Sequence, residues 1–448
     1  MELNVFWSKL FAKNSKKESP KENKKTVTRK TESKESSINE GAIKEVEVPL
    51  SFLKKLQPIC LLADLDLKAV KVLIQEFDMG QVVYEQGEPL AYVAYVVEGE
   101  VYCENKVGAH YEVVARTFKA LYPLSNSPEN LFTAIAKTAA KVIYLPKELL
   151  LESSSKQKGN NIEQQGVAEK LQNSSFGREL LGALKASALE VPSLPDVAIR
   201  LRVAVQKEIG AAEAVTIVKL DQGIAAKLVQ VVNSPLYRGV NPLTSCDAAV
   251  NRLGLISTRN LVTSFSMRSM FKSKNKQLSK RLHEAWLQSI RVSSLCHALA
   301  VLTHKVDPEE ALLAGLTHNI GLLPIISLAD QQKNISLDDV DECSKLAQAF
   351  IGQYVLNDWG FADEISEIPY LLGNWFYESG KEFGLIDIVI LAKYHSFLGS
   401  KQISMLPALH DLPAFQKLGD QSLTPDLSLQ ILHDAQQQIS ESMALFEV

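Results

Sequence analysis

The spacing of apolar residues changes once along this chain, and the change separates two kinds of structure. Residues 81–146 are rich in Val and Tyr and carry turn signals at Gly87 and Gly99, a pattern typical of short antiparallel strands. After Phe176, nearly every segment repeats its apolar residues at helical spacing instead. The sequence therefore predicts a multidomain α+β protein, with a compact β-domain first and an all-α domain second.

Five parts are expected along the 448 residues. The lysine-rich stretch 13–37 holds one Val and no other large apolar residue, so it cannot bury enough surface to fold. The stretch after residue 150 is rich in Ser, Gln and Asn, which is typical of a linker. The predicted parts are a short amphipathic segment with a disordered basic tail (1–46), two short helices feeding a β-roll (47–150), a linker (151–175), a helical domain (176–400) and a C-terminal helical extension (401–448).

The same spacing of apolar residues predicts two particular helices. The second of the two early helices is expected over Asp66–Phe77, and a last helix is expected from Thr424 to about Phe446. A further helix is expected to begin at Asp307, because a capping residue is followed there by Pro at the first helical position and then by two acids.

The first eleven residues carry an aromatic face. In a helix, five large apolar side chains would share one side of this segment: Leu3, Phe6, Trp7, Leu10 and Phe11. Because lysines follow, such a face suits peripheral contact with an anionic membrane or docking in a groove of a partner. A helix this short is marginal alone, so a frayed terminus is the third alternative.

Composition excludes several classes of protein. The net charge of −4 argues against a nucleic-acid partner for the whole chain. The sequence has neither an uninterrupted apolar run of about 18 residues nor an N-terminal apolar core, so we expect no spanning helix and no signal peptide. The five cysteines are scattered without a CxxC pair, which favours a reducing cytoplasm. Residues 1–11 leave peripheral contact with the inner membrane as an alternative.

The β-domain resembles the cyclic-nucleotide-binding domain family. The resemblance is carried by GQVVYEQGEPLAYVAYVVEGEV (80–101) and TAIAKTAAKVIYLPKELL (133–150). In that family, the intervening segment binds a ribose-phosphate through backbone N–H groups, a Glu and an Arg. Here residues 121–140 contain neither Gly nor Arg, and Lys137 and Lys141 do not occupy the expected place. The resemblance therefore implies the fold, and a cyclic nucleotide is not expected to bind because the bidentate Arg is missing.

The helical part resembles the HDOD family, the output-domain relatives of the HD metal-dependent phosphohydrolases. The resemblance covers roughly residues 176–400 and is most specific in the NSPLY phrase and the Leu-Gly step that follows it. Its signature residues are Asn233, Ser234 and Gly254. Asn and Ser side chains bond readily to local backbone, so the pair at 233 and 234 is interpreted as a helix stop, with a binding role as the alternative.

The resemblance also locates a degenerate metal site. An HD site needs a His, a downstream His-Asp pair and a later Asp, which together hold divalent ions that activate water. The corresponding positions here are Gln288, His318, Asn319 and Lys393. Asn offers a neutral carbonyl, and the Lys ammonium has no lone pair to give. The resemblance therefore implies a vestigial site with no metal, no cofactor and no catalytic residue, in which His318 is a packed histidine.

These features predict a non-enzymatic bacterial signal-transduction protein. Its HDOD domain would act as an output module that binds signalling proteins, beside a degenerate cyclic-nucleotide-binding-like domain. Three alternatives stay open: a metal-dependent phosphohydrolase of the HD superfamily, a nucleotide-sensing regulator, and an adaptor recruited to a membrane through residues 1–11.

Overall fold

The computed structural model describes residues 43–149 and 167–418 except positions 63, 69, 107, 128, 187, 209, 235, 236, 238, 333, 334 and 381, together with residues 440 and 443. Contacts divide these residues into two compact units. The β unit holds residues 43–149 and 401–411, and the helical unit holds residues 167–400 and 412 onward.

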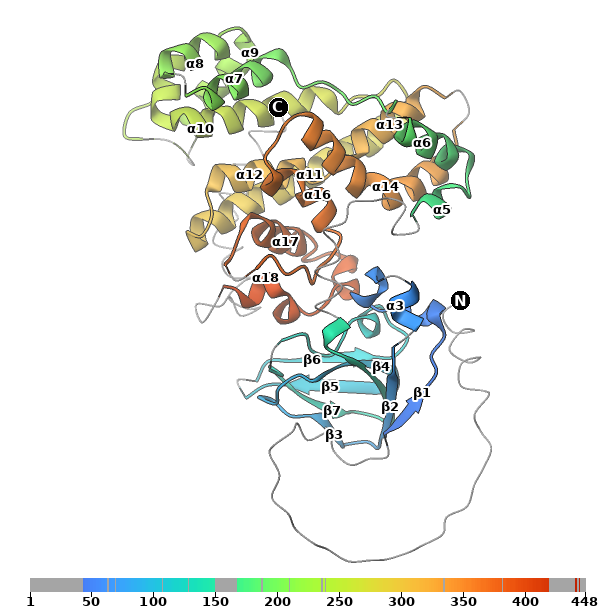
Figure 1. The fold of residues 1–448 in the computed structure, drawn as a ribbon. Helices are drawn as coiled ribbons and strands as arrows, with labels where there is room; N and C mark the ends of the chain where they lie inside the picture. The colour runs from blue at the N-terminus through green and yellow to red at the C-terminus, as the bar shows by residue number, and fades with distance from the viewer. Residues whose placement is uncertain are drawn as a thin grey trace, which may run out of the picture. The chain divides into compact units, whose positions relative to one another are not determined.

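The β unit contains two four-stranded antiparallel sheets, in the orders β1-β2-β8-β4 and β3-β7-β5-β6 (Figure 1). The first short helices, α2 (Leu50–Leu53), η1 (Ile59–Leu61) and α3 (Asp64–Lys68), precede β2. The strands are β1 (Lys44–Val46), β2 (Val72–Phe77), β3 (Val82–Tyr84), β4 (Tyr92–Glu98), β5 (Glu100–Glu104), β6 (His110–Val114), β7 (Thr133–Ala136) and β8 (Ala140–Pro146), with η2 (Lys119–Leu121) before β7. The predicted N-terminal β-domain is therefore confirmed.

Strand β4 is apolar on both faces because it separates two cores. Val93 and Tyr95 point into one hydrophobic cluster, whereas Ala94 and Val96 belong to the other. The next strand begins after Gly99, whose φ of +80° requires glycine and whose missing Cβ would lie 2.2 Å from a backbone oxygen. The turn predicted at this glycine is confirmed.

The helix predicted over Asp66–Phe77 is wrong. Helix α3 ends at Lys68, and residues 72–77 form β2, which pairs antiparallel with β8. A short apolar run such as Val-Leu-Ile suits a helix or a buried strand equally, and pairing with a strand some 70 residues later decides between them. Strand β1 also lies in residues assigned to the disordered tail (1–46), because it pairs with β2.

The helical unit is built almost entirely from helices. They are α5 (Val167–Leu171), α6 (Ser175–Lys185), α7 (Asp196–Gln206), α8 (Ala211–Val218), α9 (Gln222–Val232), α10 (Cys246–Met267), η4 (Arg268–Met270), α11 (Lys276–Thr303), α12 (Pro308–Thr317), α13 (Leu322–Asp330), α14 (Leu337–Asp358), α15 (Asp363–Ser366), α16 (Ile368–Leu371), α17 (Leu385–Ser396) and α18 (Pro413–Gln416). The predicted start of α12 is confirmed, because the Asp307 carboxylate accepts hydrogen bonds from two N–H groups of the first turn.

Helix α11 forms the centre of the helical unit and packs against α12, α13 and α17, while α7, α8 and α9 gather on α10 (Figure 1). The α11–α12 contact is close because Gly315 faces Ser293 and Cys296, where a Cβ would come within 2.8 Å of both. The five cysteines, all in the described part of the chain, form no disulfide with one another. The stretch Pro308–Asp330 is long and apolar enough to cross a membrane, but 78% of its most apolar window is buried within the fold, as in a core helix.

Two predicted boundaries differ from the structure. Helix α5 lies within the predicted linker (151–175). Residues 401–411 were assigned to a C-terminal helical extension (401–448), yet they belong to the β unit as η5 (Lys401–Met405) and η6 (Leu409–Asp411). The amphipathic segment 1–11 and most of the last predicted helix lie outside the described residues.

Candidate functional site

Two of the four predicted HD-site positions are in direct contact, and they join a chain of side-chain amides. Gln288 lies on α11, and Asn319 lies in the turn between α12 and α13. Asn319 Nδ2 donates to Gln288 Oε1 at 3.3 Å, and Gln348 Nε2 on α14 donates to Asn319 Oδ1 at 2.9 Å. The amide chain therefore links three elements of the helical core, and Asn319 is its buried centre.

His318 is buried next to this amide chain. Its Nδ1 lies 2.6 Å from the Gly315 carbonyl oxygen. Because that oxygen can only accept, Nδ1 carries the proton and Nε2 carries the lone pair. Nε2 has no hydrogen-bond partner among the described residues. Burial, followed by the nearby Lys393 ammonium, lowers the pKa of His318 to about 3, so the ring is neutral at physiological pH.

Lys393 reaches this region from α17. Its side chain is half-buried, and Nζ lies 5.7 Å from the centre of the Trp375 ring. Burial lowers the pKa of Lys393 to about 8. At pH 7 the ammonium is therefore mostly charged, and its field disfavours a second positive charge on His318.

This set of side chains does not fit a divalent metal ion. The oxygen of Gln288 already accepts from Asn319, and the oxygen of Asn319 already accepts from Gln348. The Lys393 ammonium repels cations, and both amides are uncharged, so Nε2 of His318 is the strongest remaining ligand and cannot hold an ion alone. Within residues 43–149 and 167–418, with the gaps given above, no three His, Cys, Asp or Glu side chains gather as a metal would require.

Gln348 is the member of the site that sequence reasoning missed. It lies in α14, and no motif marks it. The available signal is indirect: Gly321 and Gly352 allow α14 to approach the turn after His318 so closely that a Cβ on Gly321 would lie 2.0 Å from the Gln348 carbonyl. Small residues in both segments could have indicated this approach.

The signature residues lie elsewhere in the helical unit and make local contacts. Asn233 Nδ2 donates to the Val229 and Leu243 carbonyls at 2.9 and 2.6 Å, and its Oδ1 accepts from the Leu243 N–H at 2.7 Å. Ser234 Oγ donates to a carbonyl one turn back at 2.7 Å. Gly254 has a φ of +80° and kinks α10. These contacts are those of a helix stop and a kink, and none of them reaches the HD-site positions.

In the β unit, Lys137 and Lys141, the lysines nearest the expected phosphate-binding segment, are already paired. Lys137 Nζ lies 2.9 Å from Glu112 and 3.5 Å from Glu100. Lys141 Nζ lies 3.1 Å from Glu98, with a second glutamate at 3.5 Å. Because carboxylates neutralise both ammonium groups, the segment presents little positive charge to a phosphate.

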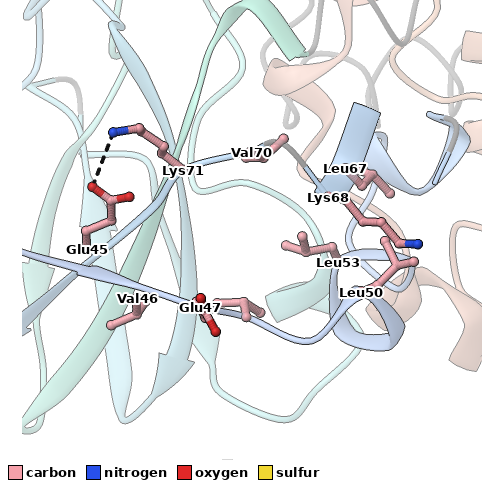
Figure 2. A pocket seen from close by; sticks show the side chains of 10 residues that line it. Glu45, Val46, Glu47, Leu50, Leu53, Leu67, Lys68, Val70 and Lys71 are labelled. Atoms are coloured by element: carbon pink, nitrogen blue, oxygen red, sulfur yellow. Dashed lines mark ion pairs between the residues drawn. The ribbon is translucent and has the colours of Figure 1, made fainter. Parts of the chain in front are cut away.

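Two cavities are separate from these residues. One of about 620 Å³ lies beside β1 and α3, where Glu45 and Lys71 form an ion pair at 3.5 Å (Figure 2). The other, of about 520 Å³, lies in the helical unit, and its described lining includes Lys227, Arg268, Lys272 and His283. The predicted HD-site residues line neither cavity.

Comparison with known proteins agrees with this architecture. Residues 191–370 match the HDOD domain family. No curated protein matches the chain.

Solved structures resemble both units. A Shewanella amazonensis protein provisionally named a metal-dependent phosphohydrolase is 27% identical, covers 60% of this chain and 97% of its own, and has a TM-score of 0.51. An HDOD domain protein of unknown function from Geobacter sulfurreducens is 19% identical over 61% of this chain and 98% of its own, with a TM-score of 0.45. A protein from Geobacter metallireducens, provisionally named a cyclic nucleotide-binding protein, is 17% identical over 25% of this chain and 86% of its own, with a TM-score of 0.21.

Proposed function

We propose that this protein is a non-enzymatic signalling protein whose HDOD domain acts by binding other proteins. The observation that carries the proposal is the amide chain of Gln288, Asn319 and Gln348, which uses for internal hydrogen bonds the oxygens that would otherwise face a metal. The ammonium of Lys393 adds a positive charge beside it. An arrangement of this kind stabilises the core and offers no activated water.

The surface of the helical unit supports a binding role. Ile199 and Val203 lie one turn apart on α7 and expose 39% and 41% of their surface, and Ile256 on α10 exposes 57%. Large apolar side chains that share an exposed helix face are typical of surfaces that bind proteins. The relative from Shewanella carries the name of a hydrolase, so phosphohydrolysis is the rival function.

A metal and activity assay separates the two functions. Full-length protein purified without chelator is expected to contain no stoichiometric Mn, Fe, Mg or Zn. It is also expected not to hydrolyse bis(p-nitrophenyl) phosphate after Mn²⁺ is added. The matched variant combines Q288H, N319D and K393D, which supplies ligands at the three altered positions, and metal uptake by this variant shows that the assay can detect a site. Stoichiometric metal and hydrolysis in the natural protein, both lost in H318A, would overturn the proposal.

The binding role has its own test. The double variant I199E/V203E is expected to keep the far-ultraviolet circular dichroism and melting temperature of the natural protein within about 2 °C, because both side chains are exposed. Chemical crosslinking in cells is expected to lose at least one partner band in this variant but not in the matched surface variant E213K/K219E. Identical crosslinking in all three proteins would show that this face of α7 binds no protein.

A further inference from the structure

A short segment from near the end of the described chain lies inside the β unit. Residues 401–411 belong to this unit, although some 250 residues separate them from its last strand. Leu406, Leu409 and Asp411 are buried, and Asp411 is only 3% exposed. An acidic side chain is rarely buried this deeply without specific contacts.

Asp411 is held by one residue of the loop between η2 and β7. The Asn126 N–H donates to Asp411 Oδ1 at 3.3 Å, and Asn126 Nδ2 donates to the Asp411 backbone oxygen at 3.4 Å. Burial raises the pKa of the Asp411 carboxyl well above its usual range. Asn126 therefore recognises both the side chain and the main chain of Asp411.

The neighbouring residue, His410, fills an aromatic site. Its ring centre lies 4.2 Å from that of Phe132 and 5.1 Å from that of Tyr111. Burial lowers the pKa of His410 to about 3, so the ring packs here as a neutral aromatic group. The Tyr111 hydroxyl donates to the Leu124 carbonyl at 2.7 Å, which fixes this wall of the site.

We propose that the loop of residues 122–132 and the adjacent Tyr111 form a peptide-binding site, and that Leu409–Asp411 of the same chain is its resident ligand. The ligand class is a short peptide with an apolar, an aromatic and an acidic residue in succession. Asn126 reads the acidic residue, and Phe132 with Tyr111 reads the aromatic one.

The same loop holds two buried polar atoms to which residues 409–411 form no hydrogen bond. Ser125 Oγ and Asn130 Oδ1 are buried in the same loop, and neither has a hydrogen-bond partner among the described residues. Leaving buried polar atoms unpaired is costly. A competing ligand that bonds to them could displace residues 409–411, which would make segment 401–411 a releasable latch of the β unit.

Hydrogen–deuterium exchange of the full-length protein tests this site. In the natural protein, the amides of residues 401–411 and 122–132 are expected to be protected. D411K places an ammonium in the buried position, so both segments are expected to exchange at least tenfold faster while β4 and β8 stay protected. The matched variant D411N keeps the shape of the side chain and is expected to keep the protection. Fast exchange of residues 401–411 in the natural protein, or unchanged exchange in D411K, would overturn the proposal.

Further measurements distinguish local release of the segment from unfolding of the β unit, and a peptide ligand from a nucleotide. If D411K unfolds the whole β unit, the milder variant H410A tests the proposal instead. Hydrogen exchange in H410A is expected to be threefold to tenfold faster in residues 401–411 and 122–132 only. A synthetic peptide of residues 404–413 is expected to restore protection of residues 122–132 in the released variant, whereas the same peptide carrying D411K is not. Restoration by cyclic AMP and not by the peptide would make the site a nucleotide site instead. This result is independent of the metal assay, which concerns the helical unit.

Discussion

Acidification from pH 6.5 to pH 4 is expected to lower the free energy of unfolding by about 3 kcal/mol through His318 alone. The pKa of this ring is about 3 in the fold, against 6.5 ordinarily. Between these two values the unfolded chain binds a proton that the folded chain does not. His318 therefore does not reduce the free energy of unfolding above pH 6.5, and it reduces this free energy progressively as the pH falls from 6.5 towards 3. Burial also lowers the pKa of His395, which adds to the effect in the same direction.

Urea unfolding followed by tryptophan fluorescence measures this effect, because three of the four tryptophans lie in the helical unit. H318Q is expected to remove most of the His318 contribution, so its unfolding free energy should fall less steeply below pH 6.5 than that of the natural protein. The exposed His283 provides the control, and H283Q should keep the natural slope. Equal slopes in H318Q and H283Q would show that His318 titrates normally and is not buried as described.

Replacing Lys393 by Met is expected to stabilise the protein by about 2 kcal/mol at pH 7. Its pKa is about 8 in the fold against 10.5 ordinarily, so the folded state disfavours the charged form. Below pH 8 the charged side chain lowers the free energy of unfolding by its full amount, and this destabilisation disappears as the pH rises towards 10.5. The full difference in pKa corresponds to about 3 kcal/mol, which partial exposure of the side chain reduces.

The stability of K393M should therefore exceed that of the natural protein at pH 7 and approach it near pH 10. The exposed Lys345 gives the control, since K345M should change the unfolding free energy by no more than about 0.5 kcal/mol. Removing the ammonium should also bring the pKa of His318 closer to 6.5, which nuclear magnetic resonance of the ring can follow. A loss of stability in K393M would mean that the contact with Trp375 outweighs the cost of burying the charge.

Local signals in the sequence predicted much of the fold. The turn at Gly99 and the start of α12 at Asp307 both depend on one or two residues whose conformational preferences act nearby. The helix assigned to Asp66–Phe77 failed because strand pairing with a distant segment overrides the local pattern. Residues 401–411 were placed in the wrong part for the same reason, since the local sequence does not reveal that their contacts are with the distant β unit.

The sequence predicted only those residues of the candidate site that belong to a recognisable motif. His318 and Asn319 are adjacent in sequence, and the contact of Asn319 with Gln288 follows from the packing of α12 on α11. Gln348 joins them through a helix packing that no motif encodes. The low pKa of His318 could not be predicted either, because it depends on the depth of burial and on the distance to Lys393.

The position of residues 401–411 has a consequence for biosynthesis. The β unit needs Asp411, which the ribosome adds roughly 260 residues after the first part of this unit has ended. At about 5–20 residues per second, residues 401–411 therefore join the β unit on the order of 10–50 s after its last strand has been made, while the helical unit is being synthesised. During that interval, Phe132 and Tyr111 are without the ring that covers them in the finished protein. A chain that stops at Ser400 would retain that unfinished state permanently.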